Sequence, residues 1–268
     1  MWVLDHPSTA RTAGLLADTP AALLAVLAIG AAASVALVEV AVLPPPAIGI
    51  AVLTAGHGAL LATALAWAHR PPATGALAAG VIGLAAAVSR LNAFGPLAYL
   101  APLLLVSVLA RGGRLGALGL AGPVALKGVV AGLFIGMFLG GHLLVTASRT
   151  VGVQVHLPTA PEALAALAYD VGANVLAAEC FFRGALFNRA QRRWSFAAAV
   201  TLATAAYVLR YLVDPLLPMR VELVVGAVFY LALLGAINCW LFWWSESLVP
   251  GFLSALIFFA VYRVLDPA

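Results

Sequence analysis

The chain has 268 residues, of which 64% are hydrophobic and only 9% are charged. Apolar runs long enough to cross a hydrocarbon core of ~30 Å recur from one end to the other, which excludes a soluble globular domain and predicts a polytopic membrane protein. The formal net charge of +4 is small and lies in loops without a basic patch interleaved with aromatic rings. Nucleic acid is therefore not an expected partner.

Nine apolar segments are predicted to span the membrane, with eight as an open alternative. In chain order they cover 20–43, 47–68, 73–90, 93–110, 124–147, 161–186, 195–213, 221–243 and 248–265. Residues 115–123 are apolar but broken by glycines, and we interpret them as an interfacial segment. The predicted fold class is all-α, a transmembrane helical bundle of about 8–9 spans.

Arginines in the predicted loops set the expected orientation. With the N-terminus inside, the inner loops hold Arg11, Arg70, Arg111, Arg114, Arg189, Arg192 and Arg193, and the outer loops hold Arg90, Arg149, Arg220 and Arg263. This imbalance predicts a cytoplasmic N-terminus, with residues 1–20 as a retained tail and not a signal peptide. One lysine beside 13 arginines favours a bacterial source, and hence the bacterial inner membrane.

The segment 124–147 carries a glycine at every fourth position: Gly128, Gly132, Gly136 and Gly140. Such a stripe predicts close approach of a neighbouring helix of the same chain, with an oligomer face as the alternative. Cys180 and Cys239 lack the spacing of metal ligands and are interpreted as buried thiols. Asn238 is expected to form a hydrogen bond between helices.

Beyond Glu162 at its start, the segment 161–186 carries Asp170, Asn174, Glu179 and Arg183, and ionisable groups inside a span indicate function by default. Asp170 and Asn174 share one helical face, and Glu179 and Arg183 share another, rotated by about 100°. Because glutamate precedes arginine by four residues, the second pair is predicted to form an ion pair within the helix.

The run Glu179-Cys180-Phe181-Phe182-Arg183-Gly184-Ala185-Leu186 resembles the first motif of the CPBP family, the CAAX-protease and bacteriocin-processing proteins, also called Abi or type II CAAX prenyl endopeptidase-like. The resemblance covers roughly residues 115–265 and extends to Leu118-Gly119-Leu120 and to the turn 245–250. It implies a bundle of about eight spans around a conical cavity that opens to the membrane. We accordingly divide the chain into about four N-terminal helices, 1–110, and a CPBP-like domain, 115–268.

In active members, the resemblance implies, a glutamate of the first motif and a histidine of the second activate water, and a histidine and an asparagine of the third stabilise the oxyanion. This sequence keeps only Glu179, Arg183 and Gly184 of the first motif. The four reactive positions are occupied by Ala178, Tyr211, Ser254 and Phe258. No histidine follows His156, so a shift of the alignment does not restore one.

The sequence therefore predicts a non-catalytic relative that acts as a binding, accessory or scaffold subunit of a membrane complex. Expected partners are membrane lipids and other integral membrane proteins. One alternative is an active CAAX-type endopeptidase with a rearranged site that uses Asp170, Glu179 and His142; another is a small-molecule transporter. The candidate polar residues of a cavity are Asp170, Asn174, Arg210 and His142.

Histidines in the predicted spans have a plainer interpretation as well. His57 and His142 are single histidines in glycine-containing segments, and we expect each to be a hydrogen-bonded core residue. No zinc signature occurs, so no metal site and no cofactor is predicted. Whether a lipid, a prenyl chain or a pigment occupies the cavity stays open.

Overall fold

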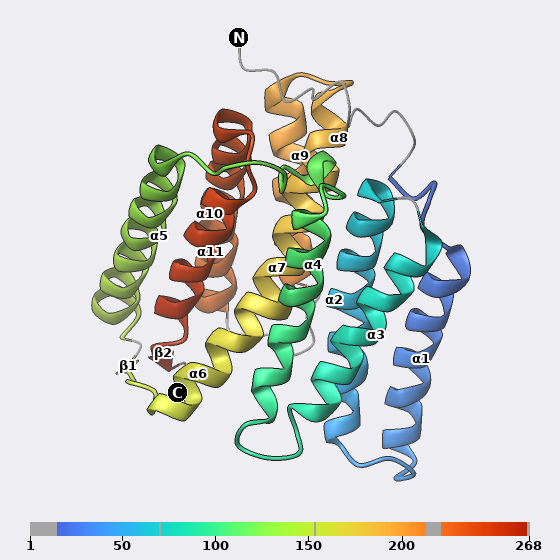
Figure 1. Ribbon diagram of the computed structural model, residues 1–268. Helices are drawn as coiled ribbons and strands as arrows, with labels where there is room; N and C mark the ends of the chain where they lie inside the picture. Colours follow the sequence, from blue (N-terminus) through green and yellow to red (C-terminus); the bar gives the residue numbers. More distant parts are fainter. Residues whose placement is uncertain (1–14, 70, 153, 213–220, 267–268) are drawn as a thin grey trace.

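The structure is a computed structural model that describes residues 15–69, 71–152, 154–212 and 221–266. Within these residues it is a bundle of long helices that run alternately up and down (Figure 1). The first half of the bundle contains α1 (Ala21–Glu39), α2 (Pro46–Ala68), α3 (Pro72–Val88), the 3₁₀ helix η1 (Gly95–Tyr99), α4 (Leu100–Arg111), the 3₁₀ helix η2 (Gly116–Leu118) and α5 (Leu126–Thr146). Arg11, Arg70 and Arg220, and most of the predicted N-terminal tail, lie outside the described residues.

The second half is built around one long helical rod that changes its hydrogen-bond pattern along its length. The rod consists of α6 (Ala160–Tyr169), the π-helix η4 (Asp170–Asn174), α7 (Val175–Ala178), the π-helix η5 (Glu179–Phe187) and α8 (Asn188–Gln191). It is followed by α9 (Phe196–Leu212), α10 (Val221–Ser245) and α11 (Val249–Tyr262). Single π turns inside α-helices occur frequently at functional sites, so η4 and η5 direct attention to this rod.

Five described helices are long and apolar enough to cross a membrane, by length and composition, and four shorter apolar helices accompany them. These helices coincide with the nine predicted segments, and the prediction of an all-helical membrane bundle is confirmed. The one departure is small: β1 (Gln154–Val155) pairs antiparallel with β2 (Leu265–Asp266), after a π-helical turn, η3 (Ala147–Val151). Two-residue strands leave no periodicity for a sequence to display.

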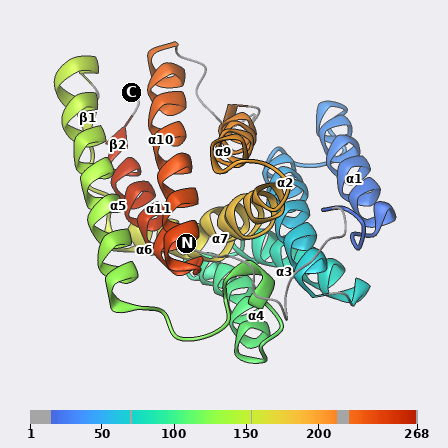
Figure 2. The same cartoon turned by 90° about the horizontal axis from the view of Figure 1, so that it is seen from above.

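The rod lies in the centre of the bundle. Seen from above (Figure 2), α7 lies between a group formed by α2, α3 and α4 and a group formed by α5, α10 and α11. The rod contacts α2, α9, α10 and α11. Its side chains belong to two apolar cores, one that includes Ala177 and Phe187 and one that includes Ala178 and Phe182. Polar side chains of the rod that lie in these two cores are therefore removed from water.

The outer surface is apolar where a bilayer would cover it. On α5, Phe134, Met137 and Phe138 are 64%, 57% and 62% exposed. No residue of α1 is buried, and α1 packs against α2. Large exposed apolar areas are rare on soluble monomers, whereas lipid is a good solvent for them.

The glycine stripe of α5 is covered by α11. A methyl group on Gly128 would lie 3.0 Å from Pro250, and one on Gly140 would lie 3.0 Å from Val261. Between them, Gly132 lies directly against the carbonyl oxygen of Pro250. The prediction of close packing within one chain is confirmed, because the missing side chains allow two helix backbones to approach each other.

Candidate functional site

The centre of the candidate site is the ion pair predicted from the sequence. Glu179 and Arg183 lie on η5, and Arg183 Nη1 is 3.2 Å from Glu179 Oε1. Both side chains are only 1% exposed. Burying two charges in an apolar medium costs several kcal/mol each, and their proximity offsets part of that cost. The ion pair therefore lies in the interior of the bundle. We call the buried pair Glu179–Arg183, together with the side chains that hold it, the clasp.

Two further helices complete the clasp around Glu179. Asn238 of α10 donates from Nδ2 to Glu179 Oε1 at 3.1 Å and to the carbonyl of Gly251 on α11 at 3.0 Å. A methyl group on Gly251 would lie 3.1 Å from Glu179 Oε2, so glycine leaves room for the carboxylate. One amide thus connects the rod, α10 and α11, and the predicted interhelical role of Asn238 is confirmed.

Arg183 is held from the other side by an aromatic ring. Its Cζ lies 4.0 Å from the centroid of the Tyr207 ring on α9. Cation–π contacts of this kind strengthen when both groups are desolvated. Arg183 therefore stabilises the packing of α9 against the rod as well as compensating the charge of Glu179.

The glycine of the first motif makes room for the loop that opens the family-like segment. A methyl group on Gly184 would lie 3.1 Å from the Leu118 side chain, and Leu118 itself is fully buried. Next to it, the amide of Leu248 donates to the carbonyl of Gly119 at 3.2 Å. The interpretation of 115–123 as an interfacial segment stays a prediction, but the first part of the segment packs inward, because Leu115 and Leu118 fill the core beneath the turn between α10 and α11.

The four residues at the reactive positions are buried close to this clasp. Ala178, Tyr211 and Phe258 belong to the same apolar core, and Ser254 is 0% exposed. Among the described residues, the hydroxyl of Ser254 has no hydrogen-bond partner. An alanine and a phenylalanine carry no titratable group, so neither can accept or donate a proton.

Aromatic rings fill the space around these positions. Tyr211 stacks on Phe259 at 5.6 Å between ring centroids, and Phe258 faces Tyr230 at 6.3 Å. Phe182 packs edge-on against Tyr207 at 5.4 Å. The rings come from the rod, α9, α10 and α11, so the interior between these helices is occupied by protein side chains.

A second buried polar network lies further along the rod, at η4. Asn174 Nδ2 donates to Asp170 Oδ1 at 2.9 Å, and Asn174 Oδ1 accepts from Arg210 Nη1 at 3.2 Å and from the Tyr211 hydroxyl at 3.1 Å. Asp170 also forms a two-pronged ion pair with Arg263, with distances of 3.0 and 3.3 Å. The structure thus brings together Asp170, Asn174 and Arg210, which are three of the four candidate polar residues.

Sequence reasoning did not place His57 in this network. Arg210 Nη2 lies 2.9 Å from His57 Nδ1, and His57 Nε2 lies 2.7 Å from the hydroxyl of Tyr169. Arg210 Nη2 also lies 3.3 Å from His57 Nε2, and a guanidinium only donates, so the imidazole accepts from Arg210. His57 is therefore a hydrogen-bonded core residue, as predicted, but its partners lie more than a hundred positions away and no local pattern indicates them.

The fourth candidate, His142, lies elsewhere. It is exposed on α5, where its Nδ1 is 2.7 Å from the Tyr230 hydroxyl. Glu179 lies against Gly251, whose neighbour Pro250 contacts Gly132 of α5. His142 follows Gly132 by about ten residues, which is about 15 Å along the helix axis. The structure does not bring His142 to Glu179.

Cation-binding groups are sparse in the part of the chain that the structure describes. There, no three histidine, cysteine, aspartate or glutamate side chains form a group that could hold a metal ion. Cys180 and Cys239 are free and buried, as interpreted from their spacing.

These observations define an integral membrane protein of helical-bundle type with a buried Glu–Arg clasp at its centre. Residues 160–260, from the start of the rod into α11, match the family model described as type II CAAX prenyl endopeptidase Rce1-like. The matched range contains the clasp and the four reactive positions, so the resemblance of this part of the chain to CAAX-protease-like membrane proteins is confirmed. Neither the curated proteins nor the solved structures give a match to the chain.

Proposed function

We propose that this chain is a non-hydrolytic relative of the CAAX-type membrane endopeptidases and acts as a binding, accessory or scaffold subunit of a membrane complex. The observation that carries the proposal is the environment of the four reactive positions. Ala178 and Phe258 are buried and non-titratable, and both pack in an apolar core with Tyr211. Peptide hydrolysis needs a base near a water molecule and donors aimed at the developing oxyanion; these positions hold no carboxylate or imidazole, and the Tyr211 hydroxyl already donates to Asn174.

The retained charges support a structural role for the motif. Glu179 Oε1 accepts from Asn238 and lies beside Arg183, so the carboxylate is engaged in holding helices together. Arg263 donates one hydrogen bond to each carboxylate oxygen of Asp170. Both carboxylates are thus occupied by partners from other helices, which leaves neither of them aimed at a substrate.

The arginines at the two ends of the bundle indicate its expected orientation in the membrane. Among the described arginines, Arg111, Arg114, Arg189, Arg192 and Arg193 follow or end helices at one end, and Arg90, Arg149 and Arg263 lie at the other (Figure 1). The positive-inside rule favours the first end, at which α1 begins, as cytoplasmic, in a bacterial inner membrane. Partners would be membrane lipids and other integral membrane proteins, with residues 1–110 as added helices beside the CPBP-like domain, 115–268.

The test is a peptidase assay on the full chain in lipid nanodiscs. Wild-type protein and Glu179→Gln are incubated with a prenylated peptide that ends in a CAAX sequence, and products are followed by mass spectrometry. We expect no cleavage above the level of empty nanodiscs for either protein. Cleavage by the wild type that disappears in Glu179→Gln contradicts the proposal, provided that both proteins elute as the same folded species.

A second experiment addresses the subunit role. The chain is extracted from its native membrane in a mild detergent, and its mass is compared with that of the chain alone. A stable, stoichiometric larger assembly supports an accessory subunit. A single chain with lipid as its only companion removes that part of the proposal, whatever the peptidase assay gives.

A further inference from the structure

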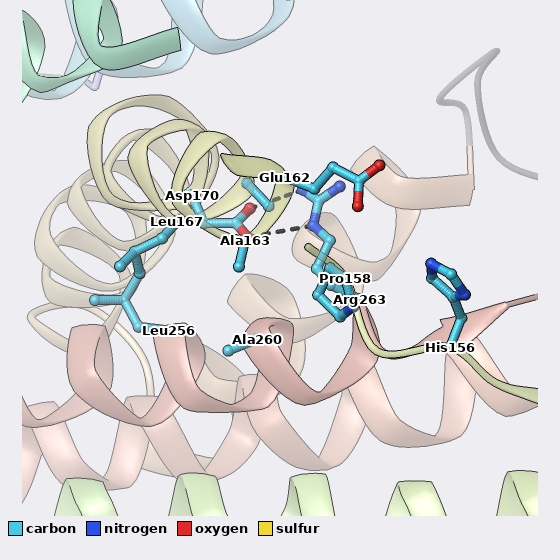
Figure 3. A pocket seen from close by; sticks show the side chains of 10 residues that line it. His156, Pro158, Glu162, Ala163, Leu167, Asp170, Leu256, Ala260 and Arg263 are labelled. Carbon is cyan, nitrogen blue, oxygen red and sulfur yellow. Dashed lines mark hydrogen bonds and ion pairs between the residues drawn. The ribbon is translucent and has the colours of Figure 1, made fainter. Parts of the chain in front are cut away.

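A pocket of about 290 Å³ opens between α6 and α11, away from the clasp. It lies where α6 begins and α11 ends, beside the connection that carries His156 (Figure 3). One end is polar and contains His156, Glu162 and Arg263, whereas Leu167 and Leu256 line the other end. Neither the family match nor the proposed function assigns a role to this pocket.

Arg263 supplies a cation that Asp170 holds in place, and one of its guanidinium nitrogens does not donate to Asp170. Its Nη2 and Nε donate to Asp170, at 3.0 and 3.3 Å, and the side chain is still 37% exposed. Within the described part of the chain, these bonds leave the third nitrogen, Nη1, to donate to a ligand. Because Asp170 is buried, the guanidinium is held with a defined orientation, which suits recognition of a phosphate oxygen.

Glu162 supplies an anion at the same end of the pocket. It closes a capping box at the start of α6: the amide and the hydroxyl of Thr159 both donate to Glu162 Oε2 at 2.8 Å. The other oxygen, Oε1, is not used by the capping box. The pocket therefore presents two carboxylates and one guanidinium beside the imidazole of His156. This excess of negative charge disfavours a purely anionic ligand and favours a ligand that also carries an ammonium group.

The other end of the pocket is apolar and open at the side. Leu167 is 48% exposed, and Ala163 and Ala260 are exposed as well. Leu256 lies two helical turns before Arg263 on α11, so about 10 Å of helix axis separates the apolar end from the polar end. The apolar end points from the end of the bundle toward its middle, which is the direction from head group to acyl chain in a lipid.

We propose that this pocket binds a phospholipid whose head group carries a primary ammonium, as in an ethanolamine phospholipid. The phosphate accepts from Arg263 Nη1, and the ammonium donates to Glu162 Oε1. The part of an acyl chain nearest the head group lies along Leu167 and Leu256. A glycerol head group offers the same phosphate but no ammonium, so it leaves the charge of Glu162 uncompensated. The site requires only that the chain spans a membrane, and it is independent of peptidase activity.

The test is native mass spectrometry of the full chain with ethanolamine and glycerol phospholipids of identical acyl chains. We expect the wild type to prefer the ethanolamine lipid by about fivefold, the factor expected for one charge–charge contact near a membrane surface. Glu162→Gln keeps the capping box, which accepts glutamine, and is expected to abolish the preference. Equal binding of both lipids by the wild type, or an unchanged preference in Glu162→Gln, overturns the proposal.

Two further arms distinguish this pocket from general lipid adhesion and from a site for the head group alone. Ala163→Trp fills the pocket, and we expect it to remove the preference, whereas Val130→Trp, on the exposed face of α5, is the matched control and retains it. Glycerophosphoethanolamine, which lacks acyl chains, is expected to compete poorly with the whole lipid. Competition at similar concentrations, or loss of the preference in both tryptophan variants, contradicts a lipid site between α6 and α11.

Discussion

The guanidinium of Arg183 stacks on the ring of Tyr207, with 4.0 Å between Cζ and the ring centroid. The contact joins the retained first motif to α9, the helix that carries Tyr211. We expect Tyr207→Leu to destabilise the protein by about 2 kcal/mol or more, because the buried cation loses its aromatic face. Thermal unfolding in detergent, followed by tryptophan fluorescence, measures the loss.

The matched control is Tyr207→Phe. In the described part of the chain, the Tyr207 hydroxyl has no hydrogen-bond partner, so its removal should change stability by less than about 0.5 kcal/mol. A large loss in the phenylalanine variant would show that the hydroxyl, and not the ring, holds Arg183.

Arg183 also compensates the buried charge of Glu179. Removing one partner of a buried ion pair leaves the other uncompensated, and Arg183→Ala should cost about 3–5 kcal/mol of stability. The double variant Glu179→Gln/Arg183→Ala should recover part of that loss, since no bare charge remains. Yield in the membrane and the unfolding midpoint in detergent report both effects. Normal stability of Arg183→Ala alone would refute the clasp.

The glycine stripe of α5 gives a prediction about packing. Gly132→Ala places a methyl group against the carbonyl of Pro250, and we expect it to cost about 1–3 kcal/mol by forcing α5 away from α11. Gly141→Ala lies on the same helix with no heavy atom within 4 Å of the new methyl group. It should be neutral or slightly stabilising, because alanine favours the helix. Similar effects of the two substitutions would argue against the α5–α11 contact.

The two membrane histidines should differ in their importance for stability. His57 is 3% exposed and bonds Arg210 and Tyr169, so His57→Leu should cost about 1–3 kcal/mol through the polar groups left unpaired. His142 is exposed and has one buried partner, the Tyr230 hydroxyl, so His142→Leu should cost less than His57→Leu, about 0.5–1 kcal/mol. Comparison of their denaturation midpoints under one condition checks the contrast, and the reverse order would contradict it.

Much of the fold could be predicted because local rules govern it. Apolar runs locate the helices, the i,i+4 spacing pairs Glu179 with Arg183, and the glycine period identifies a packed face. The π-helical segments are not visible in the sequence, because the shift of the backbone hydrogen bonds by one residue within the rod leaves no residue pattern of its own.

The long-range polar pairs could not be predicted. Asp170 meets Arg263, and His57 meets Arg210, across helices that are far apart in the chain. Such pairs depend on the order in which helices surround the rod, and one sequence does not encode that order in any local period. The same reason explains why His142 was a candidate for the polar interior although it lies on the outer face of α5.

The contact between α5 and α11 has a consequence for biosynthesis. α5 leaves the ribosome and enters the membrane well before α11 has been translated, so its row of glycines first faces lipid. A helix surface without side chains packs poorly against acyl chains, and it finds its complementary surface only when α11 arrives. Until then the newly made chain carries an unmatched groove, which insertion factors or quality-control proteases could recognise. Truncation before α11 should therefore leave the other helices inserted but mark the product for degradation.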